Sequence, residues 1–231
     1  MSIWTRIAEA VQAIIAKGES LLAVFERRRA PERSVAFTIA ILGLGAKMAK
    51  ADGLVRPNEV AAFREVFRIA PKDEAAAARV FNLARQDIAG FDVYAARIAA
   101  MFRGEPQVLE DILEGLFQIA LADGRYHGGE ELFLARVAEI FGVPPLAFTC
   151  IEARHLGRRH DPWQVLGVPR DADLRTVRAR WRELVRQNHP DKMIARGLPP
   201  ETVNLANARI AAINQAWEEI SARKREPEPV A

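Results

Sequence analysis

The chain has 231 residues, of which 50% are hydrophobic and 27% are charged, with 33 basic against 30 acidic side chains. This balance is typical of one large or two small globular domains, and it excludes a mostly disordered chain, a collagen-like chain and a disulfide scaffold. The single cysteine, Cys150, leaves no internal disulfide and no zinc site of paired cysteines. We expect it to be a small buried apolar residue. The positive surplus lies near the C-terminus, since residues 1–157 carry 19 basic and 20 acidic side chains and residues 158–231 carry 14 and 10.

The first 30 residues are predicted to form an amphipathic helix. Apolar side chains recur at heptad spacing from Trp4 to Phe25. Such a stripe can dock on the protein's own core, pair with another helix or lie on a membrane surface, and we favour docking or self-association. The longest apolar run, residues 35–46, is shorter than the roughly 20 residues that span a bilayer, so we expect a buried helix there. The expected location is cytoplasmic, with peripheral contact at the inner membrane through residues 1–30 as a variant.

Residues 31–156 contain a repeat. Ala-Lys-Ala-Asp-Gly at 49–53 recurs as Ala-Leu-Ala-Asp-Gly at 120–124, an offset of 71 residues. Each Asp is followed seven residues later by a Glu, and each motif lies between two apolar segments with helical period. The repeat therefore predicts two similar helical hairpins packed in one bundle.

The acids of this repeat allow two interpretations; they are Asp52, Glu59, Asp123 and Glu130. They can share a divalent cation, since hard cations take several oxygen ligands, although the spacing differs from that of an EF-hand. Alternatively, each Asp accepts hydrogen bonds from loop amides, and each Glu lies in the first turn of the next helix, where the helix dipole favours it. We favour the structural interpretation. The repeat resembles the TerB-like, tellurite-resistance-associated helical domain, which implies an all-helical bundle with an acidic patch for a metal or a partner.

The last third of the chain predicts two helices joined by a corner. Residues 174–188 place apolar side chains on one face at spacings of three and four. A second stripe on the same segment holds Arg175, Arg178, Arg182 and Arg186. Proline disfavours helix at the residue before it, so the helix should stop near His189 and display His-Pro-Asp at a corner. A flexible-looking stretch over 195–200 and a last helix over 201–222 should follow.

This pattern resembles a J domain, the signature of the DnaJ class of co-chaperones. The matching segments are Pro162–Val168, Trp181-Arg182-x-Leu184-Val185, His189-Pro190-Asp191-Lys192 and Ile210-x-x-Ile213-Asn214-x-Ala216-Trp217. The resemblance implies that the four arginines and Lys192 meet an acidic surface on a DnaK-type chaperone. It also implies that His189, Pro190 and Asp191 contact the hinge between the ATPase and peptide-binding domains of that partner, with no catalytic residue on this chain.

Together these observations predict an all-α protein, a TerB-like helical bundle followed by a small antiparallel helical J domain. The expected order is an amphipathic helix, the bundle, a linker, the J domain and a disordered tail, at 1–30, 31–156, 157–160, 161–225 and 226–231. This order is similar to that of DjlA-like co-chaperones, which carry a membrane anchor.

The implied function is stimulation of ATP hydrolysis by a DnaK-type chaperone, which the N-terminal helical domain recruits to an unidentified client or partner. The alternative is a metal- or stress-responsive interaction protein whose acidic bundle is the working site. We expect no required cofactor, with a divalent cation in the bundle as the one candidate. The chain carries no P-loop, HExxH or Gly-x-Ser-x-Gly motif, so we expect no enzyme. Acids interleave with the arginines, which disfavours a nucleic-acid partner.

Overall fold

The computed structural model describes residues 3–15, 33–51, 66–67, 69, 71–75, 77–78, 90–121, 126, 128–156 and 161–224. These residues form helices and no strand, which confirms the all-α prediction for the part of the chain described. The α-helices are α1 (Ile3–Ile15), α3 (Arg33–Ala51), α6 (Phe91–Met101), α7 (Pro106–Ala120), α8 (Gly128–Phe141), α9 (Pro145–His155), α10 (Pro162–Leu166), α11 (Leu174–Gln187), α12 (Pro190–Ala195) and α13 (Val203–Arg223). Two short 3-10 helices are η1 (Pro71–Asp73) and η3 (Pro200–Thr202).

The chain divides into two compact units that alternate along the sequence. The first unit comprises Met1–Val143 and Ile194–Leu205, and the second comprises Pro144–Met193 and Ala206–Ala231. The predicted domain boundary after residue 156 stays a prediction. Helix α9 belongs to the second unit. The segment Ile194–Leu205, which starts within α12, belongs to the first unit.

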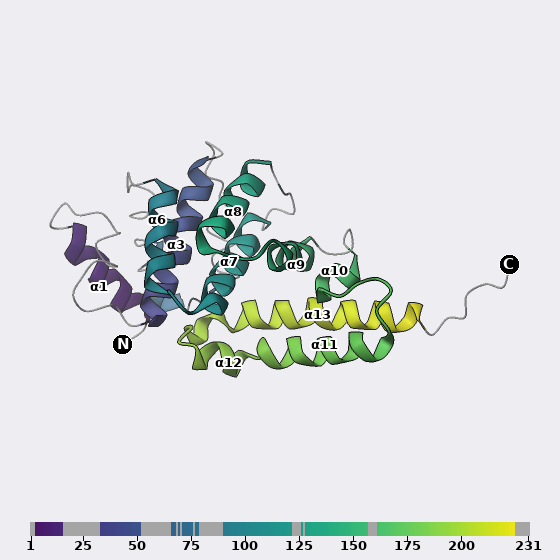
Figure 1. The fold of residues 1–231 in the computed structure, drawn as a ribbon. Coiled ribbons are helices and arrows are strands. Elements are labelled where there is room, and N and C mark those ends of the chain that lie inside the picture. The colour runs from purple at the N-terminus through teal and green to yellow at the C-terminus, as the bar shows by residue number, and fades with distance from the viewer. Residues whose placement is uncertain are drawn as a thin grey trace. The chain divides into compact units, whose positions relative to one another are not determined.

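Helix α3 is the centre of the first unit. It contacts α1, α6, α7 and α8, and α8 in turn contacts α6 and α7 (Figure 1). Every residue from Val35 to Met48 is buried. A helix that is apolar around its whole circumference must be covered on all sides, so residues 35–46 form the buried helix that the sequence predicts. Gly115 of α7 permits close approach to α3, because a Cβ there would lie 2.7 Å from Ile41 Cδ1.

Helix α1 docks on the core of its own unit. Trp4 and Ile7 are 1% and 0% exposed, and the Trp4 ring meets Phe67 edge-on with centroids 5.7 Å apart. Of the three interpretations of the amphipathic stripe, docking therefore holds for the described residues. The remainder of the predicted helix, residues 16–30, lies outside the described ranges.

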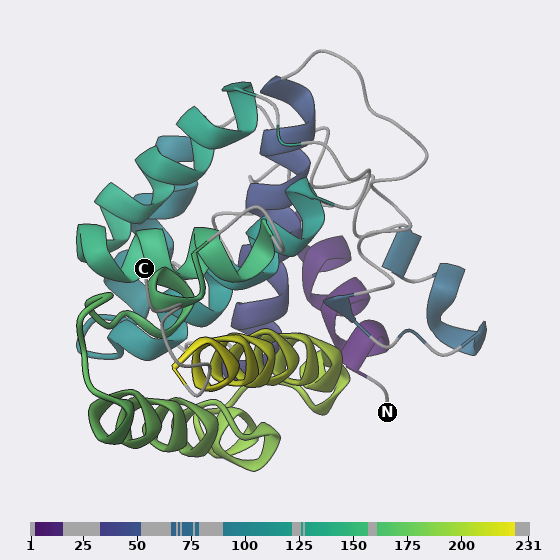
Figure 2. The ribbon, with the colours of Figure 1, turned by 90° about the vertical axis from the view of Figure 1, so that its right-hand side faces the viewer.

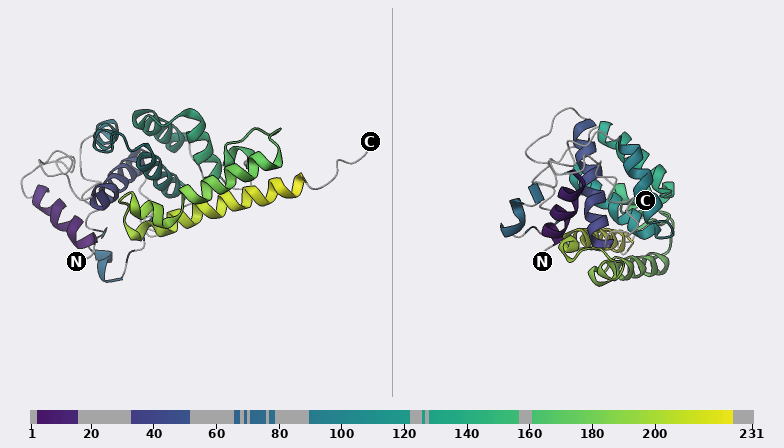
Figure 3. Two further views of the ribbon diagram at one scale, coloured as in Figure 1. Left: turned by 60° about the horizontal axis from the view of Figure 1, so that its bottom comes forward. Right: turned by 90° about the vertical axis from the view of Figure 1, so that its left-hand side faces the viewer.

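The second unit is built on α11 and α13, which run antiparallel and side by side in every view (Figures 1, 2 and 3). Between them and α10 lies an apolar core, to which α9 adds one residue; its buried members are Ala153, Val165, Leu166, Val177, Leu184, Ile213, Ala216 and Ile220. Cys150 is buried, as expected, at 8% exposure. The short helix α10 ends at Gly167, whose φ of 66° is the left-handed conformation that glycine adopts most readily.

Candidate functional site

Helix α11 begins at a side-chain cap. The Asp173 carboxylate accepts a hydrogen bond of 2.7 Å from the Thr176 amide, which satisfies one of the amides left open in the first turn. That hydrogen bond lowers the pKa of Asp173 below its ordinary value. The observed start and end of α11, Leu174 and Gln187, agree closely with the predicted segment.

The inner face of α11 is fixed to α13. Val177 and Leu184 are 0% and 6% exposed, and Trp181 stacks on Trp217 with centroids 5.2 Å apart and an interplanar angle of 15°. The Trp181 Nε1–H also donates a hydrogen bond of 2.8 Å to Asn214 Oδ1. The apolar packing and this hydrogen bond together prevent α11 from rotating about its own axis. They therefore fix the direction in which its outer face points.

The outer face of α11 presents four exposed arginines, Arg175, Arg178, Arg182 and Arg186. The last three form no hydrogen bond or ion pair with any described residue. Arg180 on the same helix behaves differently, because it donates to the Leu166 carbonyl at 3.2 Å and pairs with Glu183 at 3.0 Å. The structure thus separates one arginine held by the fold from a stripe of charge available to an acidic surface.

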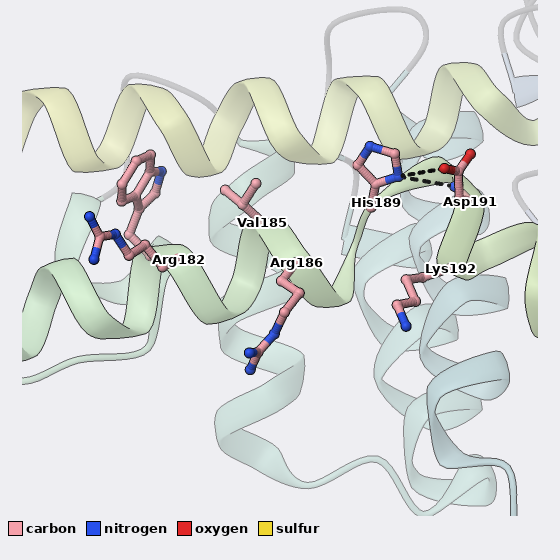
Figure 4. Close-up of a pocket in the computed structure, with 7 residues that line it drawn as sticks. Arg182, Val185, Arg186, His189, Asp191 and Lys192 are labelled. Carbon is pink, nitrogen blue, oxygen red and sulfur yellow. Dashed lines mark hydrogen bonds and ion pairs between the residues drawn. The ribbon is translucent and has the colours of Figure 1, made fainter.

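The His-Pro-Asp corner follows directly. Helix α11 is capped by Asn188, and Pro190 occupies the first position of α12, where its missing N–H costs nothing. The Asp191 amide donates to His189 Nδ1 at 3.2 Å, and the Asp191 carboxylate lies 3.5 Å from the same nitrogen (Figure 4). The two side chains remain 55% and 86% exposed, so both are presented to solvent from a defined backbone.

The sequence does not predict α12, and this part of the expectation is corrected. Asp191 lies in the first turn of this six-residue helix and Lys192 in its last turn, and the amides of Lys192 and Met193 both donate to the His189 carbonyl. The stretch from Ala195 to Pro200, expected to look flexible, contains Leu198 at 2% exposure and leads into η3. Helix α12 escapes prediction because its six residues make fewer than two turns and so show no period.

An open groove of 350 Å³ joins the arginine face to the corner. Its apolar part comes from Trp181 and Val185, and cationic side chains border it (Figure 4). In that view Arg186 and Lys192 extend away from α13, whereas His189 and Asp191 lie together at one end of the groove. The full lining is Trp181, Arg182, Val185, Arg186, His189, Asp191 and Lys192. Of the eight residues predicted to bind a partner, five therefore lie on one groove, and Arg175, Arg178 and Pro190 do not line it.

Sequence reasoning misses two polar residues behind the corner. Asn188 and Arg209 are 6% and 3% exposed, and Arg209 Nη1 donates to Asn188 Oδ1 at 2.6 Å. The available signal was a polar residue, Asn188, at an inward position of the apolar stripe. Nothing in the sequence pairs it with an arginine 21 positions later.

The candidate metal ligands are for the most part not tested. Asp52, Glu59 and Asp123 lie outside the described residues, and Glu130 lies in the first turn of α8, as the structural interpretation predicts. Within the described ranges there is no cluster of three or more His, Cys, Asp or Glu side chains that could hold a metal ion. Shared binding of a cation by the repeat stays a prediction.

Comparison with known proteins identifies both halves of the chain. The family model described as Tellurite resistance protein TerB matches residues 38–153, and the one described as DnaJ domain matches residues 161–227. A protein of Coxiella burnetii named Co-chaperone protein DjlA is 29% identical over 209 residues, covering 79% of this chain and 74% of that protein. Its namesake in Photobacterium profundum is 25% identical over 226 residues, covering 86% and 81%. The Escherichia coli K12 protein of the same name is 29% identical over 145 residues, about half of each chain at 52% and 54%. No solved structure gives a significant match.

These matches correct the expected location. The relatives carry the name of the DjlA co-chaperones, the group that is distinguished by a membrane anchor, so the predicted cytoplasmic location is wrong. Among the described helices, none combines the length and the apolarity needed to cross a membrane.

Proposed function

Because this chain belongs to the family of the tellurite resistance protein TerB and carries a DnaJ domain at its C-terminal end, we propose that it stimulates ATP hydrolysis by a DnaK-type chaperone. The coarser statement, a role as a DnaK co-chaperone, is supported by the J domain and by relatives named Co-chaperone protein DjlA. J-domain co-chaperones are not classified as a conventional enzyme family. The chemistry of ATP hydrolysis would belong to the partner, and this chain would change its rate by binding.

The observation that carries this proposal is the exposed His-Pro-Asp corner at one end of a cation-bordered groove. Arg182, Arg186 and Lys192 provide charge that steers an acidic surface toward the groove and orients it. Trp181 and Val185 provide an apolar surface that an extended segment of the partner can cover. Asp191, 86% exposed, can then pair with a cationic side chain of the partner while His189 contacts the same segment.

In this proposal binding energy is used to shift a conformational equilibrium. A ligand moves a two-state partner only by the difference between its affinities for the two states. The groove and corner would bind more tightly to the state of the chaperone that hydrolyses ATP and closes on peptide. Stimulation of the ATPase is the expected consequence, since the hydrolysing state becomes more populated.

Recruitment is the second part of the proposal. We assign it to the TerB-like bundle, which would hold an unidentified client or partner while the J domain engages the chaperone. The buried residues of the bundle stabilise its fold, and its exposed residues would provide the surface that binds this client or partner. Linking two binding functions in one chain raises the effective concentration of the chaperone at the client.

The experiment is steady-state ATP hydrolysis by a bacterial DnaK with the full chain and with His189→Gln. We expect stimulation by the unchanged chain and little by the variant, whose side chain is 55% exposed and contributes little to folding. His155→Gln in α9 is the matched control and should stimulate fully. Equal stimulation by His189→Gln and the unchanged chain would remove the corner from the mechanism, and no stimulation by the unchanged chain would remove DnaK as the partner.

The steering role has its own test. Arg182→Gln together with Arg186→Gln should raise the concentration needed for half-maximal stimulation, most strongly at low salt, because exposed charges act over a Debye length of about 10 Å at 0.1 M salt. Arg103→Gln, an exposed arginine of the first unit, is the control. An unchanged half-maximal concentration at all salt concentrations would contradict the steering role.

A further inference from the structure

A buried cation lies directly behind the His-Pro-Asp corner. Arg209 of α13 is 3% exposed, in a helix whose neighbouring inward residues are apolar, such as Ala206 and Ile213. Removing a guanidinium from water is costly, and an apolar residue of similar volume usually serves a core at least as well. A charge retained in such a place is a candidate for setting one particular geometry, and its hydrogen bond to Asn188 indicates which one.

The arginine holds the end of α11. Arg209 Nη1 donates to Asn188 Oδ1 at 2.6 Å. Asn188 Nδ2 donates to the Leu184 carbonyl at 2.7 Å, and the Asn188 amide donates to the same carbonyl at 3.0 Å. Because a guanidinium can only donate, the Asn188 oxygen must face it, and the amide nitrogen is then directed to the helix. Both polar atoms of the Asn188 side chain are therefore held, the oxygen by Arg209 and the nitrogen by the Leu184 carbonyl.

The fixed residue is the one that precedes His189. On the other side of the corner, the Met193 amide donates to the His189 carbonyl at 3.2 Å, and the Met193 side chain is 2% exposed. The corner is thus anchored at Asn188 and at Met193, while His189 and Asp191 between them face solvent. A contact surface with a fixed backbone loses less conformational entropy when a partner binds.

We propose that Arg209 is a positioning residue for the His-Pro-Asp corner: through Asn188 it fixes the last turn of α11, and so it sets the orientation in which His189 and Asp191 meet the chaperone. This inference rests on the proposed function, since it names the part of the fold that makes the corner effective. Arg209 itself does not touch the partner. Its effect therefore belongs to the maximal stimulation rather than to the encounter, which the exposed arginines govern.

The test uses the full chain with Arg209→Met, Arg209→Lys and the double variant Asn188→Leu with Arg209→Met. In the single methionine variant we expect maximal stimulation of DnaK to fall about tenfold or more, since misplacement by about 1 Å can cost a hundredfold in a reaction that depends on geometry. Arg209→Lys keeps one donor for Asn188 and should recover part of the loss. The half-maximal concentration should change little in all three.

The double variant separates positioning from stability. Replacing a buried polar pair by apolar residues is often neutral or stabilising, so this variant should fold even if the single one does not. We expect it to remain a poor stimulator. Ile213→Val is the matched control, a small cavity in the same helix that keeps both Arg209 and Asn188 and should leave stimulation unchanged. Full stimulation by the folded double variant would overturn the proposal, because the pair would then serve stability alone.

A second readout does not involve the chaperone. Amide hydrogen exchange at Lys192 and Met193, whose N–H groups bond to the His189 carbonyl, should be faster in both Arg209→Met variants than in Ile213→Val. Unchanged exchange there would contradict positioning even if stimulation fell. If the unchanged chain does not stimulate DnaK at all, the proposed function fails, but the exchange experiment still decides whether Arg209 orders the corner.

Discussion

Replacing Arg196 by Met should destabilise the first unit strongly. Arg196 Nη2 pairs with Asp111 Oδ2 at 2.8 Å, and the Asp111 side chain is 0% exposed while that of Arg196 is 22% exposed. An exposed ion pair contributes about 0–1 kcal/mol, whereas loss of one partner from a buried pair costs about 3–5 kcal/mol because a carboxylate stays out of water. Since Asp111 is fully buried, we expect the second range.

Amide hydrogen exchange in α7 is the suitable assay, because it reports the first unit without assuming that both units unfold together. For amides that exchange only by complete opening, a loss of 3–5 kcal/mol accelerates exchange by about two to four powers of ten. Arg136→Met, in α8 of the same unit, is the matched control. It removes pairs of 2.6 Å with Glu139 and 3.1 Å with Asp92, but all three side chains are about half exposed or more, so exchange in α7 should change far less.

The double variant Asp111→Leu with Arg196→Met completes the cycle. With the carboxylate gone, most of the lost stability should return, since the cost comes from the buried charge rather than from the missing contact. A loss below about 1 kcal/mol for Arg196→Met would refute the reasoning, because Asp111 would then not depend on this arginine. So would a double variant as unstable as the single one.

Three further changes test other parts of the structure. Gly115→Ala places a Cβ 2.7 Å from Ile41 Cδ1, the terminal methyl of that side chain, and the better helix propensity of alanine offsets about 1 kcal/mol, so the net loss in denaturant unfolding should stay below about 2 kcal/mol. Asp173→Asn keeps a capping oxygen but no charge. Because folding lowers the pKa of Asp173, the Asp173 carboxylate stabilises the fold at pH values above its unfolded pKa, and this stabilisation is lost as the pH falls through the folded pKa. The stability of the variant should therefore fall less steeply below about pH 4 than that of the unchanged chain. Trp181→Phe keeps the ring stack and loses the bond to Asn214, which should cost about 1 kcal/mol of unfolding free energy.

Each of these has a contrary outcome. A loss well above about 2 kcal/mol for Gly115→Ala would mean that the Ile41 side chain cannot move aside between α3 and α7. An acid-side stability curve of Asp173→Asn that follows that of the unchanged chain would assign the pH dependence to other carboxylates. A Trp181→Phe variant as stable as the parent would show that the hydrogen bond to α13 is replaced by water.

Much of the C-terminal part of the site is predictable because its signals are local. The spacing of apolar residues and arginines on α11 sets its two faces, and Asp173 and Pro190 mark where it begins and ends. The same holds for the buried helix α3, whose apolar side chains extend around the whole circumference. In these cases the neighbours that decide the structure lie within a few residues of one another, so period, cap and proline suffice.

The elements that escape prediction depend on contacts between distant parts of the chain. Asp111 and Arg196 are 85 residues apart, and Asn188 and Arg209 are 21 apart. Asp111, Arg196 and Arg209 look in the sequence like ordinary polar residues of a solvated face. Asn188 stands out at an inward position of the apolar stripe, but nothing in the sequence identifies its partner. Helix α9 is a similar case, since only packing shows that Ala153 belongs to the core of the second unit.

By itself, therefore, the sequence determined the all-α class, the two family resemblances, the cationic face of α11 and the position of the His-Pro-Asp corner. Only the tertiary structure decided that α12 follows the corner, that five predicted residues line one groove, and that Arg209 lies buried behind it. The physical reason is that helical periodicity and capping depend on interactions between residues close together in the sequence. Burial of a charge, by contrast, is tolerated only when a group from elsewhere in the chain binds that charge.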